Sequence, residues 1–327
     1  MGPRPAVAEV RLAVRHCLAG FPAGSLVLAA CSGGPDSLAL AAALAHEGPR
    51  HSLRSGAVTV DHGLQEGSAR RAQSVAATLA GLGLEPVLVK TVEVAASGAG
   101  GPEAAARTAR YRALDDAVRE TGAVAVLLGH SLDDQAETVL LGLARGAGAR
   151  SLAGMPASRG HYRRPLLGVE RATLRAACDA QGLVPWEDPH NSDPSFARAR
   201  VRHKLMPVLE AELGPGISQA LARTAAQLRA DADALDELAT EQAQQAAAED
   251  GQWHVDRLAA LPPALRARVL HQAAVAAGCP PGALSARHVA AMDSLVTQWH
   301  GQRWTNLPGG VRAMVRYGKL LFASGED

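Results

Sequence analysis

A glycine-rich turn, CSGGPDS, stands between an apolar run and a helical pattern near the start of this chain. Its glycines let the backbone turn sharply and approach a ligand, and its serines and the amide groups opening the next helix can donate hydrogen bonds to an anion. A tight turn that merely caps the helix is the alternative. The turn therefore predicts a phosphate-binding loop formed by Ser32, Gly33, Gly34, Pro35, Asp36 and Ser37. It is not of the GxxxxGKS/T type, because that motif has a lysine beside its last glycine and the nearest lysine here is Lys90.

A second stretch, GHSLDDQAETVLL, gathers acidic side chains and one histidine. If a helix begins after Ser131, then Asp133 and Asp134 lie four and three residues before Glu137, so the acids share roughly one face. A helix N-terminus favours carboxylates, and Ser131 with Asp134 fits a capping box, which accounts for one or two of them. All three together with His130 exceed that need. They suit Mg²⁺ or a cationic substrate.

Two further motifs carry polar side chains that could reach a ligand. DHGL places Asp61 and His62 directly after an apolar run, where an exposed turn is the alternative. EAAARTARY places Arg107, Arg110 and Tyr111 at helical spacings of three and four, which gives one basic face. Ordinary solvated charge is the alternative there.

A basic segment follows later in the chain, consisting of Arg198, Arg200, Arg202, His203 and Lys204. It is either a solvated helix or a face that meets phosphate. In a helix Arg198 and Arg202 align, whereas Arg200 points about 160° away from them. We expect a division of roles, with Arg200 toward the active site and the other two toward RNA phosphate, or the reverse.

Strands and helices alternate in the first half of the sequence. Apolar, β-type runs lie at residues 25–31, 56–60, 86–90 and 123–129, and helical patterns lie between them at 37–46, 68–82 and 102–121. This alternation predicts an α/β fold with a doubly wound, mostly parallel sheet, in which ligands bind at the carboxyl ends of the strands. The glycine turn, DHGL and the acidic stretch all follow predicted strands, so we expect them at one edge of the sheet.

The rest of the chain is expected to be helical near residues 170–181 and 199–213. GPG at 214–216 is a strong break, and the alanine-rich stretch at 217–250 is typical of one or two long helices. A compact unit follows and ends in an apolar, strand-like stretch, VRAMVRYGKLLF. We predict a catalytic domain at residues 1–215, a helical linker at 216–250 and a smaller C-terminal domain at 251–327, whose fold the sequence leaves open.

Composition limits the classes of protein that fit. With 47% hydrophobic and 20% charged residues over 327 positions, the chain is globular. No apolar run approaches the roughly 18 to 20 residues that cross a bilayer, and charges interrupt the first residues, so a cytoplasmic protein is expected. The cysteines, Cys17, Cys31, Cys178 and Cys279, are scattered, which predicts neither disulfides nor a zinc or iron–sulfur site. Aromatic residues make up 3%, which argues against stacking as the main hold on a nucleic acid.

Taken in order, these motifs resemble those of the tRNA(Ile)-lysidine synthetase family of PP-loop ATP pyrophosphatases. That family carries SGGxDS, DHGL, E-A-x-A-R-x-x-R-Y, GHxxDDxxET, RPLL and a late E-D-x-x-N followed by R-N-x-x-R. The corresponding stretches here are residues 32–37, 61–64, 103–111, 129–138, 164–167 and 187–202. The resemblance extends from the glycine turn to about Leu209 and is looser over the tail. Ala199 departs from it, because the family often has asparagine there.

The resemblance implies an ATP-dependent carbon–nitrogen ligase that acts on the wobble cytidine of the CAU anticodon of tRNA(Ile). Cytidine O2 would attack the α-phosphorus of ATP and expel pyrophosphate, and the ε-amine of L-lysine would then attack C2 and expel AMP, leaving lysidine. ATP and Mg²⁺ are implied, and a homodimer is left open. The glycine turn with Asp61 and His62 would hold ATP, and Asp36 and Asp134 would bind Mg²⁺. The implied catalytic residues are Asp36, His130, Asp133, Asp134, Glu137, Arg110 and Arg200.

The chemistry of lysine fits such a set of acids. Its ammonium group has a pKa of about 10.4 and must lose a proton before it attacks, so a carboxylate that binds it can also accept that proton. Asp36, Asp133 and Glu137 are the candidates. We expect Asp36→Asn and Asp134→Asn to abolish adenylation and, because like charges repel, to leave stability unchanged or raise it.

Two other functions fit parts of this pattern. A PP-loop tRNA thiolase would activate a pyrimidine in the same way but deliver sulfur, commonly through paired cysteines or a cluster, and the sequence contains neither. A nucleotide-binding RNA chaperone or sensor without catalysis would not need the full set of acids and the histidine. Release of pyrophosphate from ATP in the presence of tRNA separates these alternatives.

Overall fold

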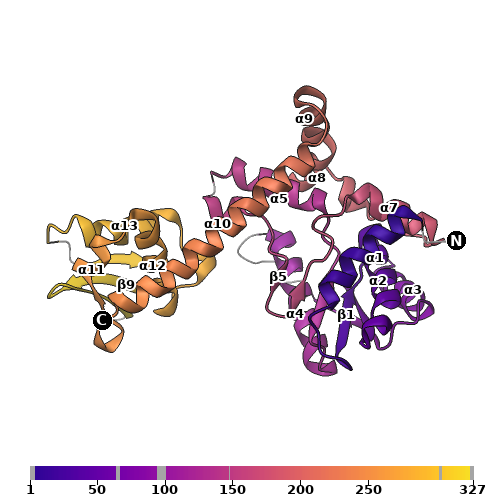
Figure 1. Cartoon of the computed structure of the whole chain (residues 1–327), viewed down its shortest axis with the longest axis horizontal. Coiled ribbons are helices and arrows are strands. Elements are labelled where there is room, and N and C mark those ends of the chain that lie inside the picture. Colours follow the sequence, from indigo (N-terminus) through magenta and orange to yellow (C-terminus); the bar gives the residue numbers. More distant parts are fainter. Residues whose placement is uncertain (1–3, 64–66, 94–100, 147, 302–303, 325–327) are drawn as a thin grey trace. The chain divides into compact units, whose positions relative to one another are not determined.

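The computed structural model describes residues 4–63, 67–93, 101–146, 148–301 and 304–324, without the side chains of 101–104, 190 and 250. Leu64 of the DHGL motif, the side chain of Glu103, and Arg303 therefore lie outside the described part. The chain divides into two compact units, Met1–Leu228 and Arg229–Asp327 (Figure 1). The long helix α10 (Ile217–Ala246) contributes to both, and it is one helix where the sequence indicated one or two.

The first unit is built from a sheet and the helices that pack on it. Its strands are β1 (Leu26–Ala30), β2 (Arg54–Asp61), β3 (Val87–Thr91), β4 (Ala125–Leu128), β5 (Ser158–Arg159) and β6 (Tyr162–Arg163). Its main helices are α1 (Pro5–Leu18), α2 (Pro35–Glu47), α3 (Ser68–Gly81), α4 (Gly101–Thr121), α5 (Leu132–Ala144), α7 (Arg171–Ala180) and α9 (Met206–Leu213). Shorter turns of helix are η1 (Pro49–His51), α6 (Ala149–Leu152), η2 (Pro189–Ser192), α8 (Ala197–Arg200) and the π-turn η3 (Val201–Leu205).

The strand order of this sheet is β3-β2-β1-β4-β6-β5. All neighbours pair in parallel except β5 with β6, so the prediction of a doubly wound, mostly parallel sheet is confirmed. The chain order reverses between β1 and β4, which makes the carboxyl ends of these two strands the switch point where ligands bind in such sheets.

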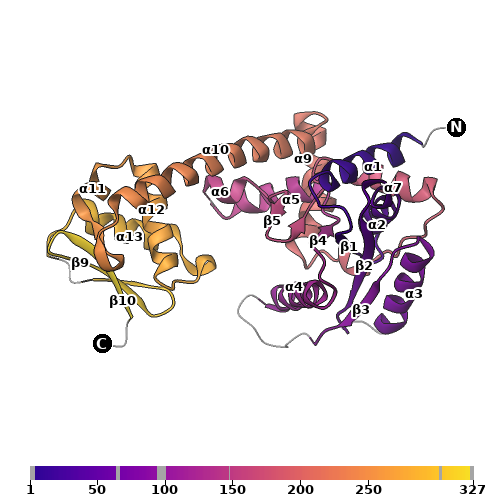
Figure 2. The ribbon, with the colours of Figure 1, turned by 60° about the horizontal axis from the view of Figure 1, so that its bottom comes forward.

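Both faces of this sheet are buried. On β1, Val27 and Ala29 pack into the core that contains α1, α2, α3 and α7, while Leu26 and Leu28 pack into a second core with α4. Figure 2 shows α4 on the opposite side of the sheet from α1 and α2. The central strands β1 and β4 are covered on both faces and consist of apolar residues, which explains why they stand out in the sequence.

The second unit is an antiparallel sheet covered on one face by helices. Its strands are β7 (Trp253–His254), β8 (Thr305–Leu307), β9 (Val311–Arg316) and β10 (Lys319–Ser324), in the order β7-β10-β9-β8. Its helical segments besides the end of α10 are η4 (Glu249–Gly251), α11 (Val255–Ala260), α12 (Pro263–Ala276), η5 (Pro281–Ala283) and α13 (Ala286–Thr297). The apolar final stretch of the sequence is thus a β-hairpin, β9 and β10, that turns at Tyr317 and Gly318.

In the described part of the chain, no helix combines the length and the apolar character needed to cross a membrane.

Candidate active site

The glycine turn and the start of α5 meet at the switch point. Strands β1 and β4 pair in parallel up to Ala30 and Leu128, and each is followed directly by one of the two motifs. A Cβ atom on Gly129 would lie 3.1 Å from the carbonyl oxygen of Asp36 and 3.1 Å from Cα of Ser37. A side chain at this position would push the backbone of the glycine turn away by a few tenths of an ångström. The two motifs therefore form one site.

The glycine turn is held in shape by its own hydrogen bonds. Ser37 Oγ donates to the Gly34 carbonyl at 2.9 Å and accepts from the Ser32 amide at 3.2 Å. Gly33 has φ +87°, and a Cβ there would lie 2.7 Å from Val75 Cγ2. Helix α2 begins immediately afterwards at Pro35, and none of the described side chains caps it. Its first amide groups and the positive end of its dipole suit a phosphate, as the sequence predicts.

Four carboxylates surround the guanidinium group of Arg171 at this edge. Arg171 Nη2 lies 2.8 Å from Asp134 Oδ1, Nη1 lies 3.3 Å from Glu137 Oε1, and Nε lies 3.5 Å from Asp36 Oδ2. Asp133 is more distant from the guanidinium, at 3.9 Å, and accepts instead from the Arg171 amide at 2.8 Å. The acids predicted from the sequence are therefore brought together, around a cation that the sequence analysis missed.

Two arginines of the basic segment also contact this group of acids. Arg202 Nε donates to Glu137 Oε1 at 2.7 Å, and Arg202 Nη2 lies 3.2 Å from Asp134 Oδ1. Arg198 Nη2 donates to Thr138 Oγ1 at 3.1 Å, and its Nε lies 3.8 Å from Glu137. We call the acids and these three arginines the acid–arginine cluster: Asp36, Asp133, Asp134, Glu137, Arg171, Arg198 and Arg202. With every group ionised, the cluster carries one net negative charge.

Arg200, which the sequence analysis expected inside the site, is not there. It is exposed and donates to the carbonyl oxygens of Pro194 at 2.8 Å and Ser195 at 2.7 Å. Arg198 and Arg202 face the acids and Arg200 faces away, which is the reverse of the arrangement with Arg200 inward, and a contact of Arg200 with RNA phosphate stays a prediction. Helical spacing explains this, because residues four apart share a face and the residue between them does not. Ala199, at the position where the resemblance leads to asparagine, is buried.

Asp134 and Asp36 differ in electrostatic state although they share Arg171. Burial acts to raise the pKa of Asp134, but the charge of Arg171 and the Ser131 amide outweigh it and hold that pKa below its usual value. Asp134 also completes the predicted capping box, because its Oδ2 accepts from the Ser131 amide at 2.9 Å. For Asp36, burial dominates and raises the pKa to about 6. Asp134 is thus fixed as an anion, whereas Asp36 can exchange a proton near neutral pH.

A group of basic side chains lies on the α4 side of the site. Arg110 is influenced by Arg107 and Arg198, and burial is the main cause that lowers its pKa. Burial also holds the pKa of His130 and of His62 below the usual range, with Arg110 adding to both, so both imidazoles are neutral at pH 7. Their Nδ1 atoms are buried and meet no hydrogen-bond partner in the described residues. No described carboxylate forms an ion pair with Arg110, so this side of the site is suited to an anion.

Asp61, the remaining predicted nucleotide contact, is buried and shapes its own turn. Its Oδ1 accepts from the Gly63 amide at 3.0 Å, so it stabilises the DHGL turn itself, and no described side chain caps α3, the helix that follows. Its neighbour His62 is within electrostatic reach of Arg110. The structure therefore connects this motif to the basic side of the site through His62.

The acid–arginine cluster fits Mg²⁺ in part, because this ion takes one or two carboxylates together with phosphate oxygens and water. Asp36 Oδ1 is buried and has no hydrogen-bond partner in the described residues, so it can serve as one ligand. Asp134 does not match its predicted role as a second ligand, because Arg171 and Arg202 occupy its Oδ1 and Ser131 occupies its Oδ2. Among the described residues, no group of three or more His, Cys, Asp or Glu side chains could hold a metal ion alone.

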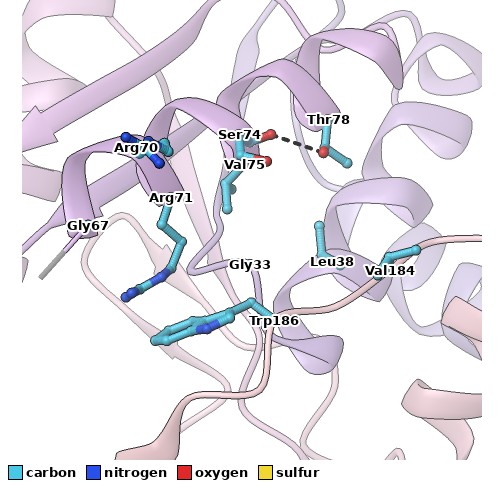
Figure 3. A pocket seen from close by; sticks show the side chains of 10 residues that line it. All are labelled: Gly33, Leu38, Gly67, Arg70, Arg71, Ser74, Val75, Thr78, Val184 and Trp186. Carbon is cyan, nitrogen blue, oxygen red and sulfur yellow. Dashed lines mark hydrogen bonds between the residues drawn. The ribbon is translucent and has the colours of Figure 1, made fainter. Parts of the chain in front are cut away.

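A separate cavity of about 340 Å³ adjoins the glycine turn at Gly33. Figure 3 shows Arg71 and Trp186 side by side at this cavity, where the Arg71 guanidinium lies 3.8 Å from the centre of the Trp186 ring. The Trp186 amide donates to the Gly33 carbonyl at 2.9 Å. None of the acids lines this cavity, so the cavity lies outside the acid–arginine cluster and shares only the glycine turn with the site.

The thiols near the glycine turn are poorly suited to sulfur chemistry. Burial raises the pKa of Cys31, and burial together with the charge of Asp36 raises that of Cys178 to about 12. Cys178 Sγ donates to the Pro35 carbonyl at 3.2 Å. Since the thiolate is the form that attacks or binds metal, both cysteines serve as packing residues here.

Comparison with known proteins places these features in a family. Residues 9–209 match the model of the PP-loop domain, and residues 253–322 match that of the TilS substrate binding domain. The chain is 57% identical to the tRNA(Ile)-lysidine synthase of Thermobifida fusca, over 99% of each chain. It is 52% identical to the tRNA(Ile)-lysidine synthase of Streptomyces coelicolor, over 99% of this chain and 100% of that one.

A solved structure shares the fold. The U34-tRNA thiolase NcsA from Methanococcus maripaludis, with its [4Fe-4S] cluster, superposes with a TM-score of 0.55 over 68% of this chain and 79% of its own. The sequence identity is 21%, so this likeness shows the fold alone.

Proposed function

Because this chain belongs to the tRNA(Ile)-lysidine synthase family, we propose that it ligates L-lysine to C2 of the wobble cytidine in the CAU anticodon of tRNA(Ile). It is an ATP-dependent, tRNA-modifying ligase. The observation that carries the proposal is the acid–arginine cluster, which stands beside the nucleotide loop and has one uncompensated negative charge. That charge suits the ε-ammonium group of lysine.

In the first step, cytidine O2 attacks the α-phosphorus of ATP and the bond to the β-phosphate oxygen breaks, releasing pyrophosphate. The glycine turn and the start of α2 hold the phosphates through Ser32, Ser37 and the helix amides. Arg110 and the neutral His130 stand on the opposite side and stabilise the negative charge that builds on the α-phosphate. Burying Arg110 without an ion-pair partner among the described residues costs free energy, which is recovered when the phosphate binds.

In the second step, the ε-amine of lysine attacks C2 and the C2–O2 bond breaks, so that AMP leaves with the oxygen. The amine must first lose a proton. Asp36 is the best-placed acceptor, because its Oδ1 is unpartnered among the described residues and its pKa of about 6 is close to working pH. Asp134 and Glu137 are already hydrogen bonded to arginines, so they fix the local charge rather than move the proton.

Mg²⁺ bound with ATP would neutralise phosphate charge, and Asp36 Oδ1 is the side-chain atom that fits it. The same oxygen cannot serve the metal and the ammonium group together. Asp36 Oδ1 would therefore hold Mg²⁺ and accept the proton from lysine at different stages of the reaction. Lysine is the free amino-acid substrate in this proposal, and the cytoplasm, where ATP, tRNA and lysine meet, is the expected location.

Measuring the two products separately tests this order. With ATP and tRNA(Ile) but no lysine, pyrophosphate should be released in a burst of about one per enzyme, and AMP should leave the complex only when lysine is added. If AMP and pyrophosphate appear together at the same rate without lysine, no adenylated intermediate waits for the amine and the two-step proposal is wrong. Incorporation of sulfur into the tRNA would favour the thiolase alternative.

A further inference from the structure

Tyr111, the aromatic residue of the EAAARTARY motif, lies among the arginines on the α4 side of the site. Its ring packs edge-on against Tyr162, with 5.0 Å between the two ring centres, and is partly buried. The guanidinium groups of Arg107 and Arg110 lie 5.1 Å and 5.7 Å from the centre of the Tyr111 ring. The phenol therefore stands in positive surroundings.

A buried arginine lies beside the Tyr111 hydroxyl group. Arg164 is 6% exposed, and no carboxylate of the described residues forms an ion pair with it. Its Nη1 donates to the Pro156 carbonyl at 2.9 Å, its Nη2 donates to the Tyr111 hydroxyl at 3.4 Å, and its Nε is buried without a partner in the described residues. Burying a cation against neutral groups alone costs free energy, which an anion bound nearby would recover.

The strand register places Arg164 at the ligand-binding edge of the sheet. Strand β6 pairs in parallel with β4, so that Arg163 lies opposite Leu127. Arg164 therefore stands level with the last residue of β4, and His130 follows two residues later. Burial is the main cause that lowers the pKa of His130, and the charge of Arg164 is a further cause. The buried arginine and the histidine of the site thus belong to the same edge.

The hydrogen-bonding capacity of the Tyr111 hydroxyl decides what it can bind. A phenol oxygen accepts hydrogen bonds and also has one proton to donate, whereas a guanidinium group only donates. Arg164 Nη2 at 3.4 Å and Arg107 Nη2 at 3.5 Å both donate to this oxygen. Its own proton meets no acceptor in the part of the chain that the structure describes. The hydroxyl is therefore a donor directed to an oxygen of a ligand, and the surrounding cations favour an anionic one.

We propose that the Tyr111 hydroxyl donates a hydrogen bond to a phosphate oxygen of the substrates, and that Arg164 is the positioning residue that holds this hydroxyl. Phosphate is the anion that both ATP and RNA bring to this edge of the sheet. The inference deepens the proposed function, on which it rests for the identity of the substrates, and it adds a contact to the basic side formed by Arg110 and His130.

Tyr111→Phe removes the hydroxyl and keeps the ring, so the melting temperature of the full chain should stay within a few degrees of the wild type. Three quantities are measured: Kd for ATP by calorimetry, Kd for tRNA by filter binding, and the single-turnover rate of pyrophosphate release. At least one should worsen about ten- to a hundredfold, as expected for loss of a hydrogen bond to a charged group. Tyr162→Phe is the matched control. It removes the same atom from the other ring of the pair, where the hydroxyl donates to Asp115, and should leave all three quantities unchanged.

The positioning role of Arg164 is tested by combining substitutions. Arg164→Met should match the loss of Tyr111→Phe, and the double variant should be no worse than either single one, because residues that act as a unit are not additive. Its melting temperature should stay the same or rise, since a buried cation without an acidic partner is removed. Arg163→Met is the control, because the neighbouring guanidinium lies 5.6 Å from the Phe21 ring instead. A lower melting temperature with unchanged substrate binding and rate would make Arg164 a structural residue and overturn its positioning role.

The outcomes for Tyr111→Phe identify the source of the phosphate. Weaker ATP binding or slower pyrophosphate release with unchanged tRNA affinity assigns the contact to the nucleotide, and weaker tRNA binding alone assigns it to the RNA backbone. If all three quantities equal those of the wild type, or if only the KM for lysine rises, the hydroxyl meets no phosphate and the inference is overturned. A wild type that releases pyrophosphate with tRNA but forms no lysidine defeats the proposed function and leaves this contact standing.

Discussion

Asp36 and Asp134 are residues of one type that the site places in opposite roles. Both contact Arg171, but Asp134 accepts further hydrogen bonds from Ser131 and Arg202, whereas Asp36 Oδ1 accepts none from the described residues. Repulsion among acids led the sequence analysis to expect the same effect on stability from both substitutions. For Asp134, the arginines compensate the negative charge, so we now expect its substitution by asparagine to lower the stability of the protein. For Asp36, we still expect the substitution to raise it.

Asp36→Asn should stabilise the protein at neutral pH and abolish adenylation. The folded-state pKa of Asp36, about 6, lies above its ordinary value, so ionising it costs native stability as pH rises from about 4 to about 6. The amide removes that cost. Urea unfolding should give a gain of about 1 to 3 kcal/mol at pH 7.5 and little gain near pH 4. A variant that is less stable than the wild type at pH 7.5 would show that Asp36 is held as a compensated anion.

Asp134→Asn should destabilise the protein by about 2 to 3 kcal/mol at pH 7, since it removes charge-assisted hydrogen bonds to two arginines. The pKa of Asp134 is held below its ordinary value, so its contribution is complete above that value and is lost as pH falls through the folded-state pKa. Urea unfolding at several pH values measures this. Asp133→Asn is the control with a smaller expected loss, because Asp133 is 3.9 Å from the guanidinium. Equal losses in both variants would argue against the special position of Asp134.

Sequence patterns located the acids of the site but not the arginine they surround. Asp133, Asp134 and Glu137 form a local pattern on one helix, so spacing alone brings them together. Arg171 belongs to another element, and only the fold brings it to them. One signal was present: Arg171 is the first residue of α7, where a cation is unfavourable because of the helix dipole. A positive charge at a helix start therefore indicated a compensating group elsewhere in the fold.

At the scale of elements, the basic segment shows how a helical turn divides adjacent arginines. Arg202→Gln should reduce kcat/KM by about ten- to a hundredfold, because it removes a charge-assisted contact from the buried Glu137. Arg200→Gln is the matched control on the opposite side of the same turn, and its stability should stay within about 0.5 kcal/mol of the wild type. Steady-state kinetics at saturating ATP and tRNA decide this. A larger loss for Arg200→Gln than for Arg202→Gln would restore the arrangement with Arg200 inward.

Helices and strands were predicted from the sequence where burial gives them a clear pattern of apolar residues. Strands β1 to β4 of the first sheet were predicted because each contains a run of apolar residues, whereas β5 and β6, of 2 residues each, were missed. Helix α1 was missed although Val7, Val10, Val14 and Leu18 repeat at helical spacing and enter the main core. Strands β7 and β8 were missed because they contain only 2 and 3 residues, too few to show an alternating pattern.

At the scale of the whole molecule, the first unit should bind ATP without the second. A chain ending at Leu228 keeps the glycine turn, the acid–arginine cluster and the cores of its sheet, so its affinity for ATP should match that of the full chain. Its affinity for tRNA should fall by at least about tenfold, because the shortened chain lacks residues 253–322, which match the TilS substrate binding domain. Calorimetry with ATP and filter binding with tRNA measure the two. Unchanged tRNA affinity would assign the second unit a structural or dimer-forming role instead.

If this chain joins lysine to tRNA in a reaction that consumes ATP, incorporation of radiolabelled L-lysine into tRNA(Ile) transcripts measures it most directly. The transcripts compared carry the anticodon CAU or UAU. We expect about one lysine per CAU transcript, dependent on ATP, and none with UAU. Equal labelling of both transcripts, or no labelling of CAU by an enzyme that releases pyrophosphate in its presence, would contradict it.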